Sequence, residues 1–358
     1  MPPPILLAGL AHLLPEVPVL AINAIFLLLS FAIILAGSEL FTNAVEWAGH
    51  RLRIAEAAVG SLLAAVGTAL PETFIPAVAL LGGRGTRQTH DAVGVGAIIG
   101  APLMLSTVAL FVMGVAALAY RKRRRRIVLK VAREDARRDL YFFLPVFALL
   151  VVAGLIPHGA LLGHLLAGAI LAVYGFYCVT MLRLERAGHA EVEHGLYLEG
   201  VFGGKPLHPR LRLITLQVIV GVCAILFGAI QFVDQVIALS QHAGISPGVL
   251  SLILSPLATE LPEKYNSVVW IRQRKDHLAL ANITGAMVFQ ACIPVALGVA
   301  FTPWRLTPAE VVAGAVTITS VAILWINLRD SQIGIPALMT GGAAYAIFIA
   351  GLRWLGAI

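Results

Sequence analysis

Long apolar runs alternate with short polar segments along almost the whole chain. The runs recur from residue 18 onward, and charged residues, Pro and Gly separate them. About 20 helical residues cross the hydrocarbon core of a bilayer, so the pattern predicts ten membrane-spanning helices, several of them long enough to tilt or protrude. The expected spans cover residues 18–49, 55–82, 92–119, 140–156, 160–182, 213–241, 247–270, 278–301, 309–328 and 334–352.

The composition agrees with a protein that crosses the membrane many times. Of the 358 residues, 59% are hydrophobic and 13% are charged, and the mean hydropathy is +0.89. Soluble domains carry about 25% charged residues, which disfavours a large soluble protein with several buried helices. The segment 1–17 has no basic start and no small-residue cleavage site, so we interpret it as an N-terminal extension.

Lys and Arg are distributed unevenly between the two ends of the expected spans. Twenty-one of the 26 fall in the loops after the first, third, fifth, seventh and ninth spans, four lie on the opposite side, and Lys264 falls within a span. Basic loops stay in the cytoplasm, so we expect the Arg-rich loop 121–138 to be cytoplasmic and both termini to lie on the outer side of the membrane. We expect the protein to be located in the plasma membrane or cell inner membrane. The basic run fits membrane topology and anionic lipid better than nucleic acid. The lipid bilayer is therefore an expected partner, and nucleic acid is not.

The two halves of the chain resemble each other at matched positions. Each carries Leu-Pro-Glu inside an apolar run, ending at Glu72 in the first half and at Glu263 in the second. A gap-free alignment brings together four further pairs: Gly37 with Gly228, Asn43 with Asp234, Thr68 with Thr259, and Pro71 with Pro262. After a loop that is six residues longer in the first half, residues 96–105 parallel residues 281–290.

Each half contains five expected spans, which is an odd number, so the second half must be inverted relative to the first. The predicted fold is an all-α integral membrane protein with ten helices in two inverted five-helix repeats. The repeats cover residues 18–182 and 213–358, and a cytoplasmic linker joins them over residues 183–212. Inverted repeats are typical of secondary transporters, which bind their substrate near the midplane where the halves meet.

Proline interrupts both matched runs. Pro71 and Pro262 cannot donate a backbone hydrogen bond, so carbonyl groups in the turns before them should lose their helical partners. Within hydrocarbon, such irregular backbone is tolerated only where it is buried in protein or lines a cavity. Freed carbonyls, threonine hydroxyls and carboxylates are the oxygen ligands that hard cations such as Ca²⁺ prefer. Two matched intramembrane acids therefore predict a cation site.

The two motifs, GTALPE at 67–72 and ATELPE at 258–263, resemble the repeats of the calcium/cation antiporter superfamily, of the sodium/calcium exchanger type. The resemblance extends over essentially all ten spans. It implies antiport of Ca²⁺ against Na⁺ or H⁺ by alternating access, without a cofactor and without enzymatic activity. It also implies that Glu72 and Glu263 are the central cation ligands and that Thr68 and Thr259 bind beside them.

The chain departs from that family's pattern at several expected ligands. The family's hydroxyl and amide ligands are replaced at five positions: Ala69, Ala101, Leu105, Ala286 and Gln290. Asn282 keeps a family asparagine, and Glu260 stands where the second motif usually has serine. We expect Glu260 to supply a third carboxylate or to carry a proton, because it and Glu263 cannot both stay ionised without a cation. The expected metal ligands are Glu72, Glu263, Thr68, Thr259, Glu260, Gln290 and Asn282, with Asn43 and Asp234 as further pathway residues.

Other interpretations stay open at this point. Na⁺ is preferred over H⁺ as the counter-ion, because neither half has the G-N-x-x-E-H pattern of the proton-coupled branch. A cation channel is disfavoured because inverted repeats with paired acids favour alternating access. An intramembrane enzyme is disfavoured because the chain lacks HExxH, a Gly-x-Ser-x-Gly elbow and a P-loop.

Overall fold

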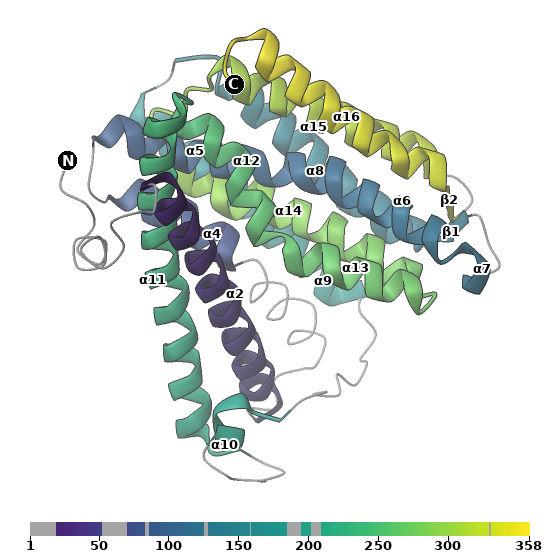
Figure 1. Ribbon diagram of the computed structural model, residues 1–358. Helices are drawn as coiled ribbons and strands as arrows, with labels where there is room; N and C mark the ends of the chain where they lie inside the picture. The colour runs from purple at the N-terminus through teal and green to yellow at the C-terminus, as the bar shows by residue number, and fades with distance from the viewer. Residues whose placement is uncertain are drawn as a thin grey trace.

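The computed structural model describes residues 19–51, 70–82, 86–124, 128–157, 159–184, 195–201, 209–328 and 331–358 (Figure 1). The first half contains α2 (Val19–Arg51), α4 (Leu70–Leu81), α5 (Arg87–Met104), the π-helix η2 (Leu105–Ala109), α6 (Leu110–Ala119), α7 (Arg121–Arg124), β1 (Val128–Lys130), α8 (Arg133–Ala153) and α9 (Ala160–Leu184). The second half follows with α10 (Tyr197–Val201), α11 (Leu211–Ala243), α12 (Pro247–Thr259), α13 (Leu261–Arg272), α14 (Asp276–Phe301), α15 (Pro308–Asn327), β2 (Gln332–Gly334) and α16 (Ile335–Trp354).

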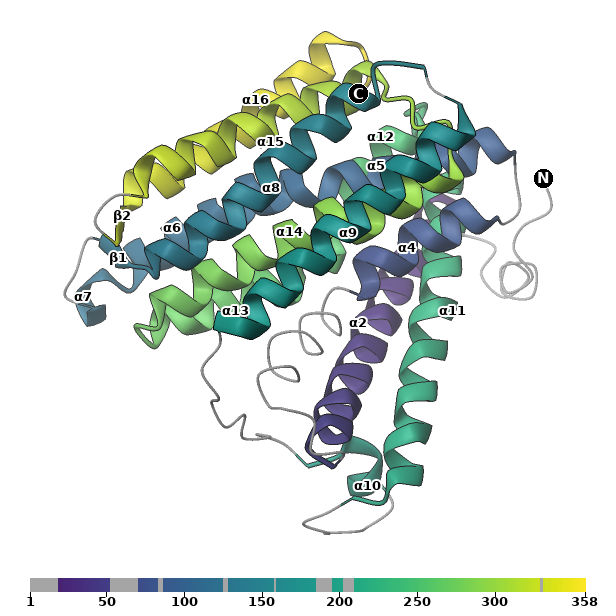
Figure 2. The same cartoon turned by 180° about the vertical axis from the view of Figure 1, so that it is seen from behind.

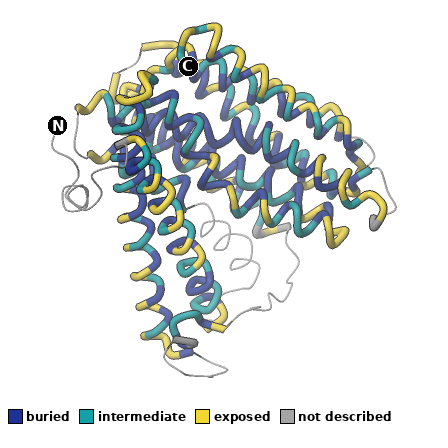
Figure 3. Tube along the Cα trace, in the orientation of Figure 1, coloured by how far each residue is buried: buried dark blue, intermediate teal, exposed yellow. Residues whose placement is uncertain are grey.

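The helices have the length and surface of a membrane protein. Seven of those described are long and apolar enough to cross a bilayer, and α4 and α12 are shorter apolar helices. Buried residues line the inner faces, whereas large apolar side chains such as Leu28, Leu161 and Ile347 are at least 65% exposed on the outer faces (Figure 3). Exposure of such apolar faces to water is unfavourable, whereas contact with lipid chains is not. The expected all-α membrane fold is confirmed, and the count of ten spans stays a prediction.

Helices α2 and α11 lie side by side and run in opposite directions (Figures 1 and 2). A Cβ atom added to Gly37 would lie 2.9 Å from the backbone nitrogen of Ile225, and one added to Gly228 would lie 2.7 Å from Ile34 Cγ1. Small residues let membrane helices approach closely. Because Gly37 and Gly228 are matched in the two halves, this antiparallel crossing is the packing that inverted repeats require.

The central layer is built on α5 and α14, the matched third helices of the two halves. α12 crosses α5 so closely that Gly96 and Gly100 face the backbone carbonyls of Gly248 and Leu252. α14 packs against α4, α5, α8, α9 and α13, and more than half of its residues are buried. These contacts bury one face of each of α4, α12 and α13, which carry the interrupted motifs.

The loops at each end of the bundle also contact one another. β1 and β2 pair antiparallel with Leu129 opposite Ile333, and the backbone N–H of Lys130 donates to Asp276 Oδ2 at 3.1 Å. At the other end, the N–H of Leu306 donates to the carbonyl of Gly154 at 3.0 Å. The loops after the third, seventh and ninth expected spans therefore meet at one end, as their shared basic character predicts. The small sheet is an addition that the helical pattern did not predict.

Candidate cation site

A break in the helix lies directly before Pro262. α12 ends at Thr259 and α13 begins at Leu261, with φ −92° and ψ 11° at Glu260 between them. Pro262 lies in the first turn of α13, where a residue without a backbone N–H is tolerated. In the first half, the described part of α4 begins at Leu70, directly before Pro71. The chain is therefore interrupted inside the bundle, as the sequence predicts for the second motif.

The two matched glutamates come together from opposite halves. Glu72 lies in the first turn of α4 and Glu263 in the first turn of α13, and they are 5% and 3% exposed. Glu72 interacts electrostatically with both Glu263 and Glu260 across the interface between the halves. The two carboxylates therefore belong to one charged cluster at the interface between the halves.

These carboxylates have unused oxygen atoms. Within the described residues, both side-chain oxygens of Glu72 and Oε2 of Glu263 are buried without a hydrogen-bond partner. A buried carboxylate oxygen without a partner destabilises the fold, because it has lost its hydrogen bonds to water and has gained none from the protein. A desolvated cation between the two acids would satisfy them, and its negative ligands would come from both repeats.

Three other expected ligands are buried or half-buried in the second half. Thr259 is buried as the last residue of α12. Asn282 on α14 donates to the backbone carbonyl of Glu263 at 3.4 Å, so it positions the start of α13. Gln290, farther along α14, lies beside the Glu260 carboxylate. Thr68 lies outside the described residues.

Glu260 has a partner that the sequence analysis missed. Its side chain is 0% exposed, and its Oε2 lies 3.4 Å from Nζ of Lys264, one helical turn farther along the chain. Lys264 is itself only 8% exposed, and Nζ also donates to the carbonyl of Pro256 at 3.4 Å. The signal was available, because Lys264 is the single Lys or Arg inside any expected span and intramembrane charges are functional by default.

The described acids do not form a site by themselves. No group of three or more His, Cys, Asp or Glu side chains is arranged to hold a metal ion in the part of the chain that the structure describes. Ca²⁺ takes six to eight oxygens, many of them carbonyl or amide oxygens and water. A cation at Glu72 and Glu263 therefore has to draw on hydroxyl, carbonyl or water oxygens as well.

Asn43 has a fixed position at one end of the α2–α11 pair. Its Oδ1 accepts hydrogen bonds from the backbone N–H of Tyr197 at 3.2 Å and from Nε2 of Gln217 at 2.9 Å. The Tyr197 hydroxyl donates to Glu39 at 2.8 Å, and this bond raises the pKa of Tyr197 to about 12. The network ties α10 to both long helices. Asp234 is half-buried on α11, and a pathway role for Asn43 or Asp234 stays a prediction.

A second unpredicted feature is the π-helix η2, which joins α5 to α6 and begins at Leu105. Leu105 is the first-half counterpart of Gln290 in the sequence alignment. π-Helical turns are rare and lie mostly at functional sites. The two halves therefore depart from each other at the same point in their third helices.

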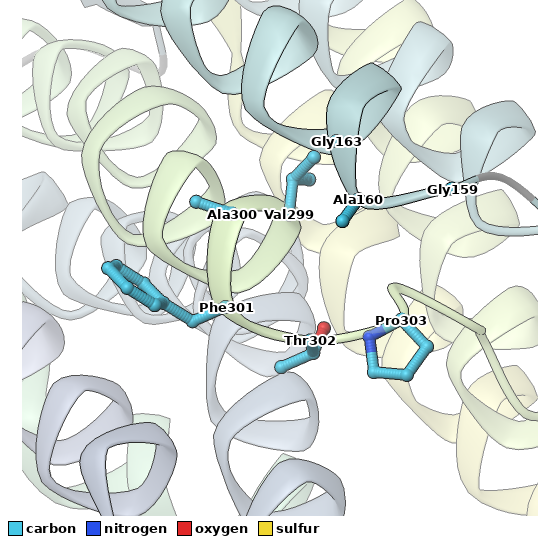
Figure 4. A pocket seen from close by; sticks show the side chains of 8 residues that line it. All are labelled: Gly159, Ala160, Gly163, Val299, Ala300, Phe301, Thr302 and Pro303. Atoms are coloured by element: carbon cyan, nitrogen blue, oxygen red, sulfur yellow. The ribbon is translucent and has the colours of Figure 1, made fainter.

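The structure also has an apolar cavity of about 350 Å³ between the start of α9 and the end of α14 (Figure 4). Gly159, Ala160, Gly163 and residues 299–303 line it. The lining contains no carboxylate and only one side-chain hydroxyl, on Thr302. This cavity therefore lacks the ligands that a cation needs and is distinct from the acidic cluster.

Comparison with known proteins agrees with this arrangement. The profile of the sodium/calcium exchanger protein family matches residues 22–183 and again residues 213–354, so each half matches separately. CaxA of Alkalimonas amylolytica, named as an antiporter, is 23% identical over 79% of this chain and 82% of its own length. The inner membrane protein YrbG of Escherichia coli is 24% identical over 84% of this chain and 87% of its own.

Two solved structures share the fold. The H⁺/Ca²⁺ exchanger CAX superposes with a TM-score of 0.73 at 17% identity, covering 97% of this chain and 85% of its own. The sodium-calcium exchanger NCX_Mj superposes with a TM-score of 0.57 at 20% identity, covering 92% of this chain and 99% of its own. With the family profile matching both halves, the chain belongs to the sodium/calcium exchanger protein family of membrane proteins and is a secondary transporter, not an enzyme.

Proposed function

We propose that the protein exchanges Ca²⁺ for Na⁺ across a membrane by alternating access. The observation that carries this proposal is the meeting of Glu72 and Glu263, two buried carboxylates from inverted halves with oxygens that lack hydrogen-bond partners among the described residues. Two buried carboxylates can both be ionised only with a compensating cation beside them, because unpaired buried charge is strongly unfavourable. A Ca²⁺ ion or two monovalent ions would neutralise them equally.

In the proposed cycle, a partly dehydrated Ca²⁺ ion binds between the start of α4 and the start of α13. Glu72 and Glu263 hold it from opposite halves, and the Thr259 hydroxyl and the Thr68 hydroxyl complete its shell. The C-terminal end of α12 points its last carbonyls toward the same region, and such ends favour cations. After release, two monovalent ions take the place of Ca²⁺ before the site turns to the other side.

The α2–α11 pair is the element that we expect to move. These two helices pack mainly on each other and protrude from the rest of the bundle (Figures 1 and 2). Their glycine-based crossing keeps them together as one unit. Rocking of this unit against the bundle would expose the site first on one side of the membrane and then on the other.

H⁺ is the second candidate counter-ion. A carboxylate that has lost its cation can take up a proton instead, and several such oxygens lack a hydrogen-bond partner within the described residues. The fold relatives include both a named H⁺/Ca²⁺ exchanger and a named sodium-calcium exchanger, which supports Ca²⁺ as cargo. We place the β1–β2 end in the cytoplasm and the protein in the plasma or inner membrane, because of the basic loops.

The test is Ca²⁺ uptake into proteoliposomes that contain the purified protein. Separate vesicle sets carry a Na⁺ gradient, a pH gradient or neither, at matched ionic strength. Uptake that needs the Na⁺ gradient supports the proposal, and uptake that needs only the pH gradient selects H⁺. Uptake that proceeds without any counter-ion would identify a channel and contradict antiport.

A further inference from the structure

We infer that Lys264 is a tethered cation that permanently occupies one subsite of the transport centre, so that a single divalent ion exchanges for two monovalent ions without net charge movement. This inference rests on the proposed function. In this inference Glu260 forms a permanent ion pair with Lys264, and Glu72 and Glu263 are the acids that bind the mobile ions.

The geometry around Lys264 is that of a bound cation. The ammonium lies 3.4 Å from a carboxylate oxygen of Glu260 and 3.4 Å from the backbone carbonyl oxygen of Pro256. Pro256 lies in the last turn of α12, and the C-terminal end of a helix attracts positive charge. A carboxylate and a helix-terminal carbonyl are the ligands that a monovalent ion would use in an interrupted transporter helix.

Burial makes this pair a fixed one. Glu260 is 0% exposed and Lys264 is 8% exposed. Either partner alone would leave an uncompensated charge inside the membrane. The pair also lies within the centre, because Glu260 interacts with Glu263 and Glu72 interacts with all three neighbouring charges, including Lys264.

The charge balance follows from these contacts. Glu72, Glu260 and Glu263 bring three negative charges when ionised, and Lys264 returns one positive charge. The two charges that remain match one Ca²⁺ or two Na⁺. The first half has no equivalent pair, because Ala69 and Thr73 stand at the positions that match Glu260 and Lys264. The tethered cation is therefore specific to the second half.

Four variants separate this inference from a role of Glu260 as a ligand. They are Glu260→Gln, Lys264→Gln, the double variant with both changes, and Arg272→Gln as a control that removes an exposed charge from the same helix. Apparent Ca²⁺ affinity is measured from uptake into proteoliposomes, and folding is checked by thermal unfolding. Glu260→Gln should weaken Ca²⁺ binding by at least about 10-fold, because it leaves the ammonium unpaired beside the site. The double variant should return to within about 3-fold of wild type, like the control.

The second measurement is the Ca²⁺ gradient reached at equilibrium under a clamped membrane potential. One net charge moved through 100 mV changes that gradient by about 50-fold. We expect no change for the wild type, and a dependence on potential for Lys264→Gln, which leaves Glu260 free to take a third monovalent ion.

Several results would overturn the inference. A double variant as weak as Glu260→Gln would make Glu260 a ligand of the mobile ion. Wild-type exchange that responds to potential by about 50-fold per 100 mV would show that net charge moves. Either result leaves the proposed antiport intact, whereas wild-type vesicles that take up no Ca²⁺ with any gradient would end both proposals.

Discussion

The two inverted halves share a frame and differ in their chemistry. Each places a glutamate in the first turn of a half-helix, at Glu72 and at Glu263, and each encloses it beside a long central helix. At its motif the second half adds a buried ion pair, Glu260 with Lys264, whereas the matching positions of the first half are Ala69 and Thr73. Duplication therefore explains why the two acids meet, and the differences between the copies determine which charges remain available for ions.

The third helices of the halves show the same contrast. α14 continues as an α-helix through Gln290, whose amide lies beside Glu260. The first half has Leu105 at the matching position, and there the helix changes into the π-turn η2. An amide side chain thus occupies this position in one half, whereas the other half has an apolar side chain and an altered backbone turn there. Four sets of variants test this contrast between the halves.

The largest effect is expected from the acids that the halves share. Glu72→Gln and Glu263→Gln should each reduce Ca²⁺ exchange by about 100-fold or more, equivalent to about 2.8 kcal/mol, because each removes half of the charge that holds the cation. Initial rates of Ca²⁺ uptake in proteoliposomes measure this. Glu134→Gln, which changes an exposed acid at the start of α8, should behave as wild type. Near-normal exchange in a folded Glu263→Gln protein would refute the assignment.

The next effect is expected at the helix crossing that relates the halves. Gly37→Val should destabilise the protein by about 1–3 kcal/mol and slow exchange, because the new side chain has no room between α2 and α11. Thermal unfolding and uptake rates report the two effects. Gly168→Val is the matched control, because a Cβ at Gly168 would meet no atom within 4 Å. Equal stability and equal uptake rates of the two variants would show that α2 and α11 leave room for a side chain where they cross.

A smaller effect is expected when the second half is made more like the first. Gln290→Leu should weaken apparent Ca²⁺ affinity by about fivefold, the equivalent of one hydrogen bond of about 1 kcal/mol. The loss is indirect, because Gln290 lies beside the Glu260 carboxylate, which we assign to Lys264 and not to the mobile cation. Competition binding with Ca²⁺ measures it. A loss as large as that of Glu263→Gln would place Gln290 on the ion itself.

The smallest effect on transport is expected at Asn43. Asn43→Ala removes the bonds to Tyr197 and Gln217, so the unfolding free energy should fall by about 1–2 kcal/mol while Ca²⁺ affinity stays unchanged. Thermal unfolding and uptake titrations on the same sample separate the two quantities. An affinity change of more than about 3-fold, or about 0.65 kcal/mol, would instead support a place for Asn43 in the ion pathway.

The sequence predicted the features that follow from periodicity and duplication. The sequence pattern identified the two matched acids, Glu72 and Glu263, and the matched glycines, Gly37 and Gly228. It could do so because the helix lengths, the prolines and the odd number of spans in each half allow few ways of placing the two halves in a membrane. Lys264 was missed because a hydropathy pattern tolerates one charge within a span, and Pro262 hides the four-residue spacing from Glu260.

Contacts between segments far apart in the chain could not be predicted from the sequence pattern. β1 and β2 are three residues each and lie about 200 residues apart in the chain, so no local signal marks their pairing. The bonds of Asn43 likewise depend on where α10 lies against α2 and α11. Alignment with Asp234 could place Asn43 at a matched position but could not specify its partners.

We propose that Glu72 and Glu263 form one shared cation site between the halves. Equilibrium Ca²⁺ binding tests this most directly, by isothermal titration to purified wild type, Glu72→Gln, Glu263→Gln and the double variant, each checked for folding. We expect a single Ca²⁺ per wild-type chain, loss of binding in either single variant, and no further loss in the double variant. Retention of undiminished Ca²⁺ binding by either single variant would show that the halves bind independently and would contradict a shared site.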